Sequence, residues 1–74
     1  MDINDFIDKI LNYEEEYEII IETEDYNYYI NYDDEVYKCS DLGNIEYRDL
    51  ECLAIDLFNK IAKRKENIIE ISNW

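Results

Sequence analysis

The chain has 74 residues, 47% of them hydrophobic and none of them proline, so it should fold as one small domain over residues 1–74 rather than form a disordered acidic tail. Twenty acidic residues against seven basic ones give a net charge of −13, which excludes nucleic acid as a direct partner. Without histidine the chain lacks the commonest general base and metal ligand, and it has no apolar run long enough to span a membrane.

The charge is unevenly distributed along the chain. Residues 1–56 carry 18 acidic and three basic residues, whereas residues 57–74 carry two acidic and four basic ones. A compact chain of this length has a radius of gyration of about 11 Å. Its negative charge per unit length therefore approaches that of duplex DNA. Solubility needs far less charge, and self-repulsion on this scale opposes folding. The composition therefore favours binding to a protein with a basic groove over a merely solvated acidic surface, which remains the alternative.

The first predicted element is an amphipathic helix over residues 3–12, because its apolar residues recur at i, i+3, i+4, i+7 and i+8. Residues 16–23 and 26–32 then alternate between apolar and polar, which predicts two antiparallel strands. A two-residue turn at Glu24-Asp25 would place the apolar residues of both strands on one face. The expected opposed pairs are Ile21 with Tyr28, Ile19 with Ile30, and Tyr17 with Tyr32.

A second turn at Asp33-Asp34 predicts a third strand, with Tyr37 and Cys39 on the same apolar face. The opposite face should be exposed, and a tyrosine among its carboxylates suits an interface anchor. That face would display Glu18, Ile20, Glu22, Asn27, Tyr29, Asn31, Val36 and Lys38. The two turns would add Glu24, Asp25, Asp33, Asp34 and Glu35 at the ends of the sheet.

The only glycine, Gly43, lies in the segment 41–44, which should form a loop before a second helix. We expect this helix to begin near residue 45 with Asn44 as its N-cap, and to end beside the basic residues 63–65 with Asn67 at C′. Residues 68–74 are either a fourth strand or a short docked extension, and we favour the strand. The predicted fold is α+β: a three-stranded antiparallel meander packed against two helices, in the order α-β-β-β-α with this final β.

The sequence offers little for catalysis or metal binding. Cys39 and Cys52 lack CxxC spacing and are too few for a disulfide framework, which favours an intracellular protein. Asp33-Asp34-Glu35 lacks the spacing of a calcium-binding loop. Paired carboxylates such as Glu22 and Glu24 have no evident pocket in which a catalytic acid could be created. We therefore expect no enzyme activity, no cofactor and no metal site.

Two stretches resemble a known family. The segment MDINDFI at residues 1–7, followed by Ile10 and Asn12, is similar to the start of a family of small phage anti-CRISPR proteins. INYDDEVY at residues 30–37 resembles that family's second hairpin, with an apolar strand, an Asn/Asp turn and a tyrosine-bearing strand. The expected order of helix, meander and helix also matches. The resemblance covers roughly the first 60 residues.

The resemblance implies a DNA mimic that inhibits the type II CRISPR effector nuclease by occupying the basic cleft that reads the protospacer-adjacent motif. By position, Asn31, Asp33, Asp34 and Glu35 would take over contacts that arginines and lysines make with DNA. The family carries a further acidic helix near its end, whereas this chain turns basic at residues 60–65. A different effector, or a different basic target, therefore remains open.

The acidic composition and the resemblance both predict a non-enzymatic inhibitor that serves a phage in evading host defence and acts in the bacterial cytoplasm. Its partner would be a basic nucleic-acid-binding protein, most simply a CRISPR effector nuclease, and the chain itself would be a monomer or a small homo-oligomer. The alternative is a generic acidic interaction module that inhibits another host enzyme. The expected partner-binding residues are Glu18, Glu22, Glu24, Asp25, Tyr29, Asn31, Asp33, Asp34 and Glu35.

Overall fold

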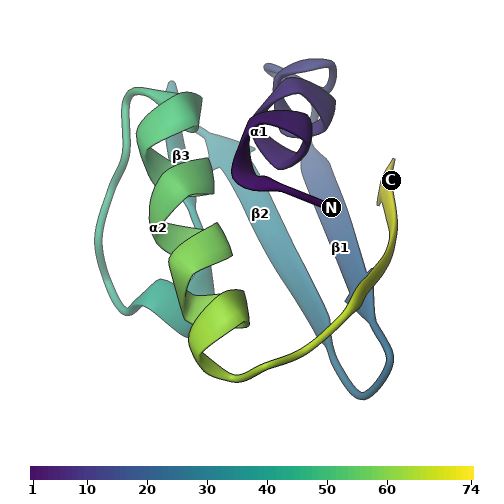
Figure 1. The fold of residues 1–74 in the computed structure, drawn as a ribbon. Coiled ribbons are helices and arrows are strands. Elements are labelled where there is room, and N and C mark those ends of the chain that lie inside the picture. Colours follow the sequence, from purple (N-terminus) through teal and green to yellow (C-terminus); the bar gives the residue numbers. More distant parts are fainter.

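Two helices lie on one face of a four-stranded antiparallel sheet (Figure 1). The computed structural model describes residues 1–74. Its elements are α1 (Ile3–Leu11), β1 (Glu18–Thr23), β2 (Asn27–Asp33), β3 (Val36–Lys38), the 3-10 helix η1 (Ser40–Leu42), α2 (Leu50–Lys63) and β4 (Ile68–Asn73). The predicted α+β fold and its order α-β-β-β-α-β are confirmed, and the C-terminal segment forms the fourth strand.

The strands lie in the order β3-β2-β1-β4, so the last strand pairs with the first. The predicted β1–β2 register is confirmed, with Ile19 opposite Ile30 and Ile21 opposite Tyr28. Thr23 closes the tight turn that joins the two strands, because its backbone N–H donates to the carbonyl of Tyr26 at 2.8 Å. This register places the apolar residues of both strands on the face covered by the helices.

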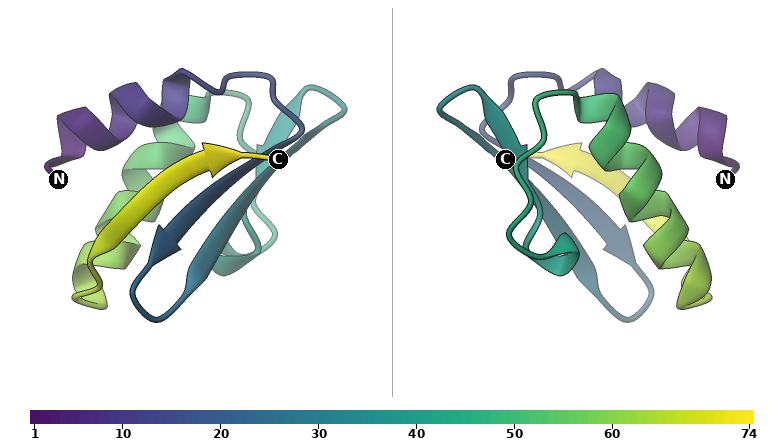
Figure 2. Two further views of the ribbon diagram at one scale, coloured as in Figure 1. Left: turned by 90° about the vertical axis from the view of Figure 1, so that its right-hand side faces the viewer. Right: turned by 90° about the vertical axis from the view of Figure 1, so that its left-hand side faces the viewer.

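The core lies between the sheet and the two helices (Figure 2). Each helix faces the core with the apolar stripe that the spacing of its apolar residues predicted. The two helices also pack on each other, with the ring centroids of Phe6 and Phe58 5.3 Å apart. Burial of apolar surface on this one side leaves the other side of the sheet to solvent. The buried core residues are Phe6, Ile10, Ile19, Ile21, Tyr28, Ile30, Tyr37, Cys39, Leu50, Leu53, Ala54, Leu57 and Ile61.

The second helix begins later than predicted. It starts at Leu50 with Asp49 as N-cap, whose carboxylate accepts a backbone hydrogen bond of 3.0 Å, and Asn44 is not the cap. The residues before it extend along the edge of β3, where Tyr37 and Tyr47 exchange two backbone hydrogen bonds of 2.7 and 2.9 Å. A helix starting at Asn44 would leave that edge unpaired, so sheet pairing outweighs the local helical signal.

The helix ends also differ in detail. α1 ends at Leu11, one residue before the predicted end. At the end of α2 the C′ residue is Lys65 with φ 58°, and not Asn67. The N–H of Lys65 donates to the carbonyl of Ala62, and the N–H of Glu66 donates to that of Ile61. This pair of bonds is a Schellman motif, a common helix ending.

Two predictions near the acidic strands are wrong. β1 begins at Glu18, and Tyr17 is 70% exposed instead of lying on the apolar face. Val36, predicted to be exposed, is only 8% exposed because the segment from η1 onward folds back beside it.

The turn between β2 and β3 consists of Asp34 and Glu35, and not of Asp33 and Asp34. The pairing of β3 is therefore shifted relative to the prediction. Tyr37 and Cys39 nevertheless lie on the buried face as predicted, because a shift of two residues preserves the alternation of faces.

The molecule measures 32 × 23 × 20 Å and has a radius of gyration of 11.0 Å, in agreement with its length. The β1–β2 turn lies at one end of the sheet, and the β2–β3 turn lies at the other (Figure 2). Neither helix is long and apolar enough to cross a membrane.

Candidate interaction surface

The face of the sheet opposite the helices is left uncovered along β1, β2 and β4 (Figure 2). Its residues alternate along β1 and β2 with the buried ones, and the register adds residues of β4 beside β1. We call this surface the acidic sheet face, defined by Glu18, Ile20, Glu22, Asn27, Tyr29, Asn31, Asp33 and Glu70. These residues include four carboxylates, and Lys38 of β3, directly opposite Asn31, is a cation on the same face.

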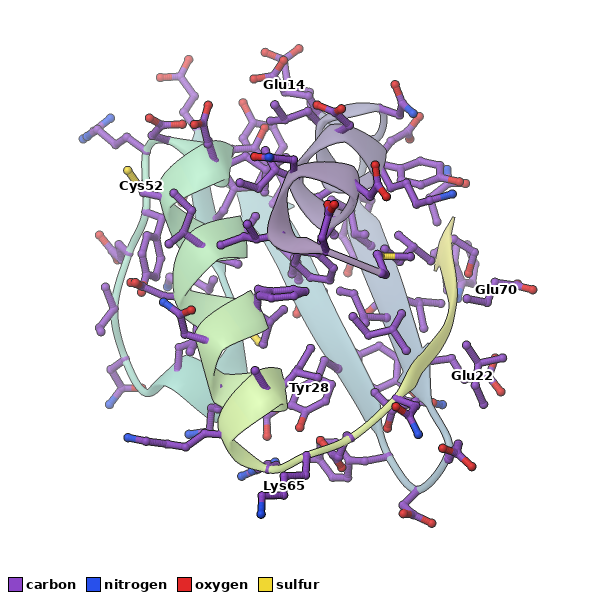
Figure 3. The ribbon with its side chains drawn as sticks, viewed as in Figure 1. Glu14, Glu22, Tyr28, Cys52, Lys65 and Glu70 are labelled. Atoms are coloured by element: carbon purple, nitrogen blue, oxygen red, sulfur yellow. The ribbon has the colours of Figure 1, made fainter.

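The carboxylates on the acidic sheet face are held by the strand register. The Asn31 amide Nδ2 donates to Glu18 Oε2 at 3.0 Å, across the β1–β2 pair. Glu22 and Glu70 lie directly opposite each other on β1 and β4, and both point away from the helices (Figure 3). Two like charges opposite each other destabilise a sheet. This pair therefore raises the negative potential at a cost in stability.

An apolar centre separates the carboxylates on this face. Ile20 of β1 lies opposite Tyr29 of β2, and the Tyr29 side chain is 41% exposed. Glu18 and Glu22 lie on either side of Ile20 along the strand, about 13 Å apart. A tyrosine ring surrounded by charged groups is a common anchor in protein interfaces. The face is thus suited to contact a protein, with charges around a small apolar patch.

A polar hollow of about 530 Å³ lies at the β3 side of the face. Asn31 and Asp33 line it from β2, and the segment after η1 forms the opposite wall. The one ion pair in the structure lies here, between Lys38 Nζ and Glu46 Oε2 at 3.5 Å. The Asp33 carboxylate is without a side-chain partner, so it is free to accept hydrogen bonds from outside. The remaining lining residues are Val36, Ser40, Gly43 and Asn44.

A second acidic cluster lies at the end of the sheet, which we call the acidic end: Glu14, Glu15, Glu16, Asp34 and Glu35. The N–H of Glu15 donates to the Tyr37 hydroxyl at 2.9 Å, which joins the α1–β1 loop to the sheet. The ring of Tyr37 lies 4.5 Å from that of Tyr32.

Desolvation raises the pKa of the Tyr32 hydroxyl, and the nearby carboxylates of Glu15, Glu35 and Glu14 raise it further. The two acidic loops therefore act on the same tyrosine.

The structure does not bring all nine predicted site residues together. Glu18, Glu22, Tyr29, Asn31 and Asp33 share the acidic sheet face. Asp34 and Glu35 lie beside it at the acidic end, separated from the other turn by the length of β2, about 20 Å.

Glu24 and Asp25 lie at that other turn. The Glu24 carboxylate accepts a hydrogen bond of 2.6 Å from Asn67 Nδ2, which holds it beside the end of α2.

Four acidic residues of the acidic sheet face and the acidic end were not among the predicted site residues: Glu14, Glu15, Glu16 and Glu70. Glu70 could have been found by continuing the predicted alternation of faces into the fourth strand. The glutamates before β1 carried no such signal, because only the packing of their loop against Tyr32 and Tyr37 places them.

The basic residues are concentrated far from the acidic end. Lys60, Lys63, Arg64 and Lys65 lie at the end of α2, and Lys65 and Glu14 lie at opposite ends of the molecule in Figure 3. Arg64 is held there, because its Nη1 donates to the Tyr28 hydroxyl at 3.0 Å. The acidic end and the basic cluster, which are separated along the sequence, are therefore also separated in space.

Both cysteines have a raised pKa. Burial raises the pKa of the Cys39 thiol, and the Asp49 carboxylate raises that of the exposed Cys52. Neither thiol is therefore activated as a nucleophile. No group of three or more Cys, Asp or Glu side chains is arranged to hold a metal ion.

The fold and surface together define a small acidic α+β protein with an open sheet face. Comparison with protein-family models, with curated proteins and with solved structures found no match for this chain.

Proposed function

We propose that this chain is a non-enzymatic DNA mimic that binds the basic cleft of a nucleic-acid-binding protein and excludes its DNA. The type II CRISPR effector nuclease is the first candidate partner, on the resemblance of residues 1–7 and 30–37 to phage anti-CRISPR proteins. The observation that carries the proposal is the charge arrangement. Twenty acidic residues form only one ion pair, and those of the sheet face and the adjoining end lie on ordered strands and turns.

The amount of charge supports this proposal. The longest dimension of the molecule is 32 Å, and duplex DNA of that length carries about 19 phosphates. The chain carries 20 acidic residues and a net charge of −13, so its net charge is about two thirds of that of DNA over the same length. A cleft that binds DNA through lysines and arginines would attract this surface from a distance, and salt would screen that attraction.

The fixed geometry also supports it. A carboxylate accepts paired hydrogen bonds from an arginine guanidinium much as a phosphate does. Asp33 beside the polar hollow and Glu70 beside Glu22 are exposed and lack a cationic partner within the chain. Because strand pairing already holds these groups, binding costs less conformational entropy than it would for a flexible acidic tail.

Charge reversal on the acidic surface tests the proposal. Asp33→Lys with Asp34→Lys should weaken inhibition of target-DNA cleavage by about a hundredfold, because two favourable contacts become repulsive. The matched control is Asp8→Lys with Glu51→Lys, which changes the net charge equally but lies on the exposed sides of the helices. The control should inhibit within a few-fold of the unmodified chain, and circular dichroism should show that both variants fold.

Equal loss of inhibition in both variants would mean that only net charge matters and would contradict a defined binding surface.

The apolar centre at Ile20 and Tyr29 favours one alternative, a generic acidic module that inhibits another host enzyme. Affinity capture from bacterial lysate separates the two functions. A nuclease or another DNA-binding protein is expected under the first, and a partner without affinity for DNA would support the second.

A further inference from the structure

A second cavity, of about 570 Å³, lies between α2 and the segment that leads from η1 to α2, which runs beside the helix in Figure 1. We call it the basic cavity. One wall is a single face of α2, because its residues follow the i, i+3, i+4 and i+7 spacing of neighbours on a helix. These residues are Asp56, Asn59, Lys60 and Lys63, and Arg64 at the C-cap adds a third cation. The opposite wall consists of Leu42, Ile45 and Tyr47.

The three cations of the basic cavity form no ion pair within the chain, since the one pair in the structure joins two other residues. Three carboxylates near them instead accept hydrogen bonds from tyrosine hydroxyls. These pairs are Asp56 with Tyr47 at 2.6 Å, Asp41 with Tyr26 at 2.9 Å, and Glu66 with Tyr28. The ammonium groups of Lys60 and Lys63 are therefore available to a ligand in the cavity.

Lys60 is the most informative of these cations. Its side chain is half-buried, and partial removal of an ammonium group from water costs free energy unless an anion compensates it. The negative end of the α2 dipole favours cations near the last turn. That dipole acts on every side of the helix, however, so it does not explain why the cations line a cavity.

The number of cations indicates the charge of the ligand. A phosphate monoester carries a charge of about −1.5 to −2 and has several acceptor oxygens, and both lysine and arginine bind it well. A single carboxylate would carry half of that charge and engage fewer of the three cations. Two lysines and an arginine around one cavity therefore suit a phosphate group.

The opposite wall indicates the rest of the ligand. Ile45 is 51% exposed although it is apolar, and the half-buried Tyr47 presents an aromatic ring beside it. A planar base stacks on an aromatic side chain whatever its sequence identity. The cavity volume is also in the range of small-molecule sites.

We propose that the basic cavity binds a mononucleotide, with its phosphate beside Lys60 and Lys63 and its base against Tyr47. The net charge of −13 selects a small ligand, because a nucleic-acid strand or an anionic membrane would extend from the cavity over acidic surface and be repelled. The acidic end lies at the far end of a molecule 32 Å long. Its repulsion is screened at the cavity, because the Debye length is about 8 Å at physiological ionic strength.

Titration of the ¹⁵N-labelled chain with AMP, followed by NMR, tests the proposal. AMP should bind with a Kd of about 1 mM or tighter and shift the amide signals of residues 42–47 and 56–64. Inorganic phosphate and adenosine should each bind at least about tenfold more weakly, because each makes only part of the contacts. Equal affinity for AMP and phosphate, or for AMP and adenosine, would overturn the proposal, as would the absence of saturable shifts.

Lys60→Gln should weaken AMP binding about tenfold, because a hydrogen bond to a charged group is lost. The matched control Lys9→Gln changes the net charge equally on the exposed side of α1 and should bind AMP like the unmodified chain. Equal loss in both variants would show that only net charge matters and would overturn the proposal.

Tyr47→Leu should weaken binding of AMP but leave that of inorganic phosphate unchanged. Because Tyr47 also contacts Asp56, Ile45→Ser at an exposed position provides a second test with the same expected result. A variant pair that loses phosphate and AMP equally would contradict a base on this wall. An aspartate-rich peptide that binds more tightly than AMP would overturn the proposal in favour of an acidic protein partner. No DNA-binding partner is present in these titrations, so their failure would leave the proposed function standing.

Discussion

Glu35 illustrates at the residue scale how a surface charge conflicts with backbone preference. Asp34 and Glu35 form the β2–β3 turn with φ values of 53° and 63°. Two-residue hairpin turns of this kind prefer Asn-Gly or Asp-Gly, because only glycine adopts positive φ without strain. The chain therefore has a carboxylate at a position where glycine would be more stable.

Glu35→Gly should raise the free energy of unfolding by about 0.5–1 kcal/mol while weakening inhibition. Urea unfolding and a DNA-cleavage assay measure the two effects. Lys65→Gly is the matched control, because Lys65 has φ 58° at the end of α2, outside the acidic surface. It should stabilise similarly and leave inhibition unchanged. Loss of stability in Glu35→Gly would contradict the turn described here.

Tyr28 links the core to the end of α2. Its side chain is fully buried, and its hydroxyl donates to Glu66 and accepts from Arg64. Burial, followed by the hydrogen bond to Glu66, raises the pKa of Tyr28 to about 12 from the ordinary value of 10. The folded chain therefore holds this proton more tightly than the unfolded chain does.

Stability should consequently be complete below pH 10 with respect to this group and should fall as the pH rises from about 10 to 12. Unfolding by urea at a series of alkaline pH values measures the slope. Tyr28→Phe removes the group and should flatten the slope. Tyr47, whose pKa burial and Asp56 also raise to about 12, should account for part of what remains. An unchanged slope in Tyr28→Phe would contradict this assignment.

At the scale of elements, the helix α2 provides the support for the sheet. Leu57 is fully buried between α2 and the strands. Leu57→Ala should lower the free energy of unfolding by about 2–5 kcal/mol, because it leaves a cavity that the core cannot fill. In a domain of this size that is a large part of the total stability. Thermal melting measures the effect, and a change of less than about 1 kcal/mol would contradict the packing.

The elements with strong periodicity could be predicted from the sequence. The stripes of α1 and α2 and the alternation of β1 and β2 determine which residues are buried, and the register follows from keeping one face apolar. The start of α2 could not be predicted, because the segment before it forms a β-bridge between Tyr47 and Tyr37. The local sequence around Tyr47 does not indicate a pairing with a residue ten positions earlier. The residues of the acidic sheet face followed from the alternation. Asp34 and Glu35 of the acidic end followed from the predicted turn. Glu14, Glu15 and Glu16 did not, since their place depends on how Glu15 packs against Tyr37.

At the scale of the whole molecule, the net charge of −13 opposes folding. Raising NaCl from about 20 to 500 mM should therefore stabilise the chain. If screening contributes about 1 kcal/mol, the melting temperature rises by about 4–8 °C. Glu14→Gln with Glu16→Gln removes repulsion at the acidic end and should reduce this rise. A melting temperature that falls with salt would show that attractive ion pairs dominate, in contradiction to the single pair found.

The central claim is that the folded chain presents fixed negative charge that a DNA-binding cleft accepts in place of DNA. The most direct measurement is competition with fluorescently labelled duplex DNA for a guide-loaded type II CRISPR effector, across a salt series. We predict that the unmodified chain displaces the DNA, that displacement weakens steadily as salt rises, and that Asp33→Lys with Asp34→Lys weakens it about a hundredfold. A chain that leaves the DNA bound at every salt concentration would contradict the claim for this effector. Displacement that is equally strong in the charge-reversed variant would contradict it for this surface.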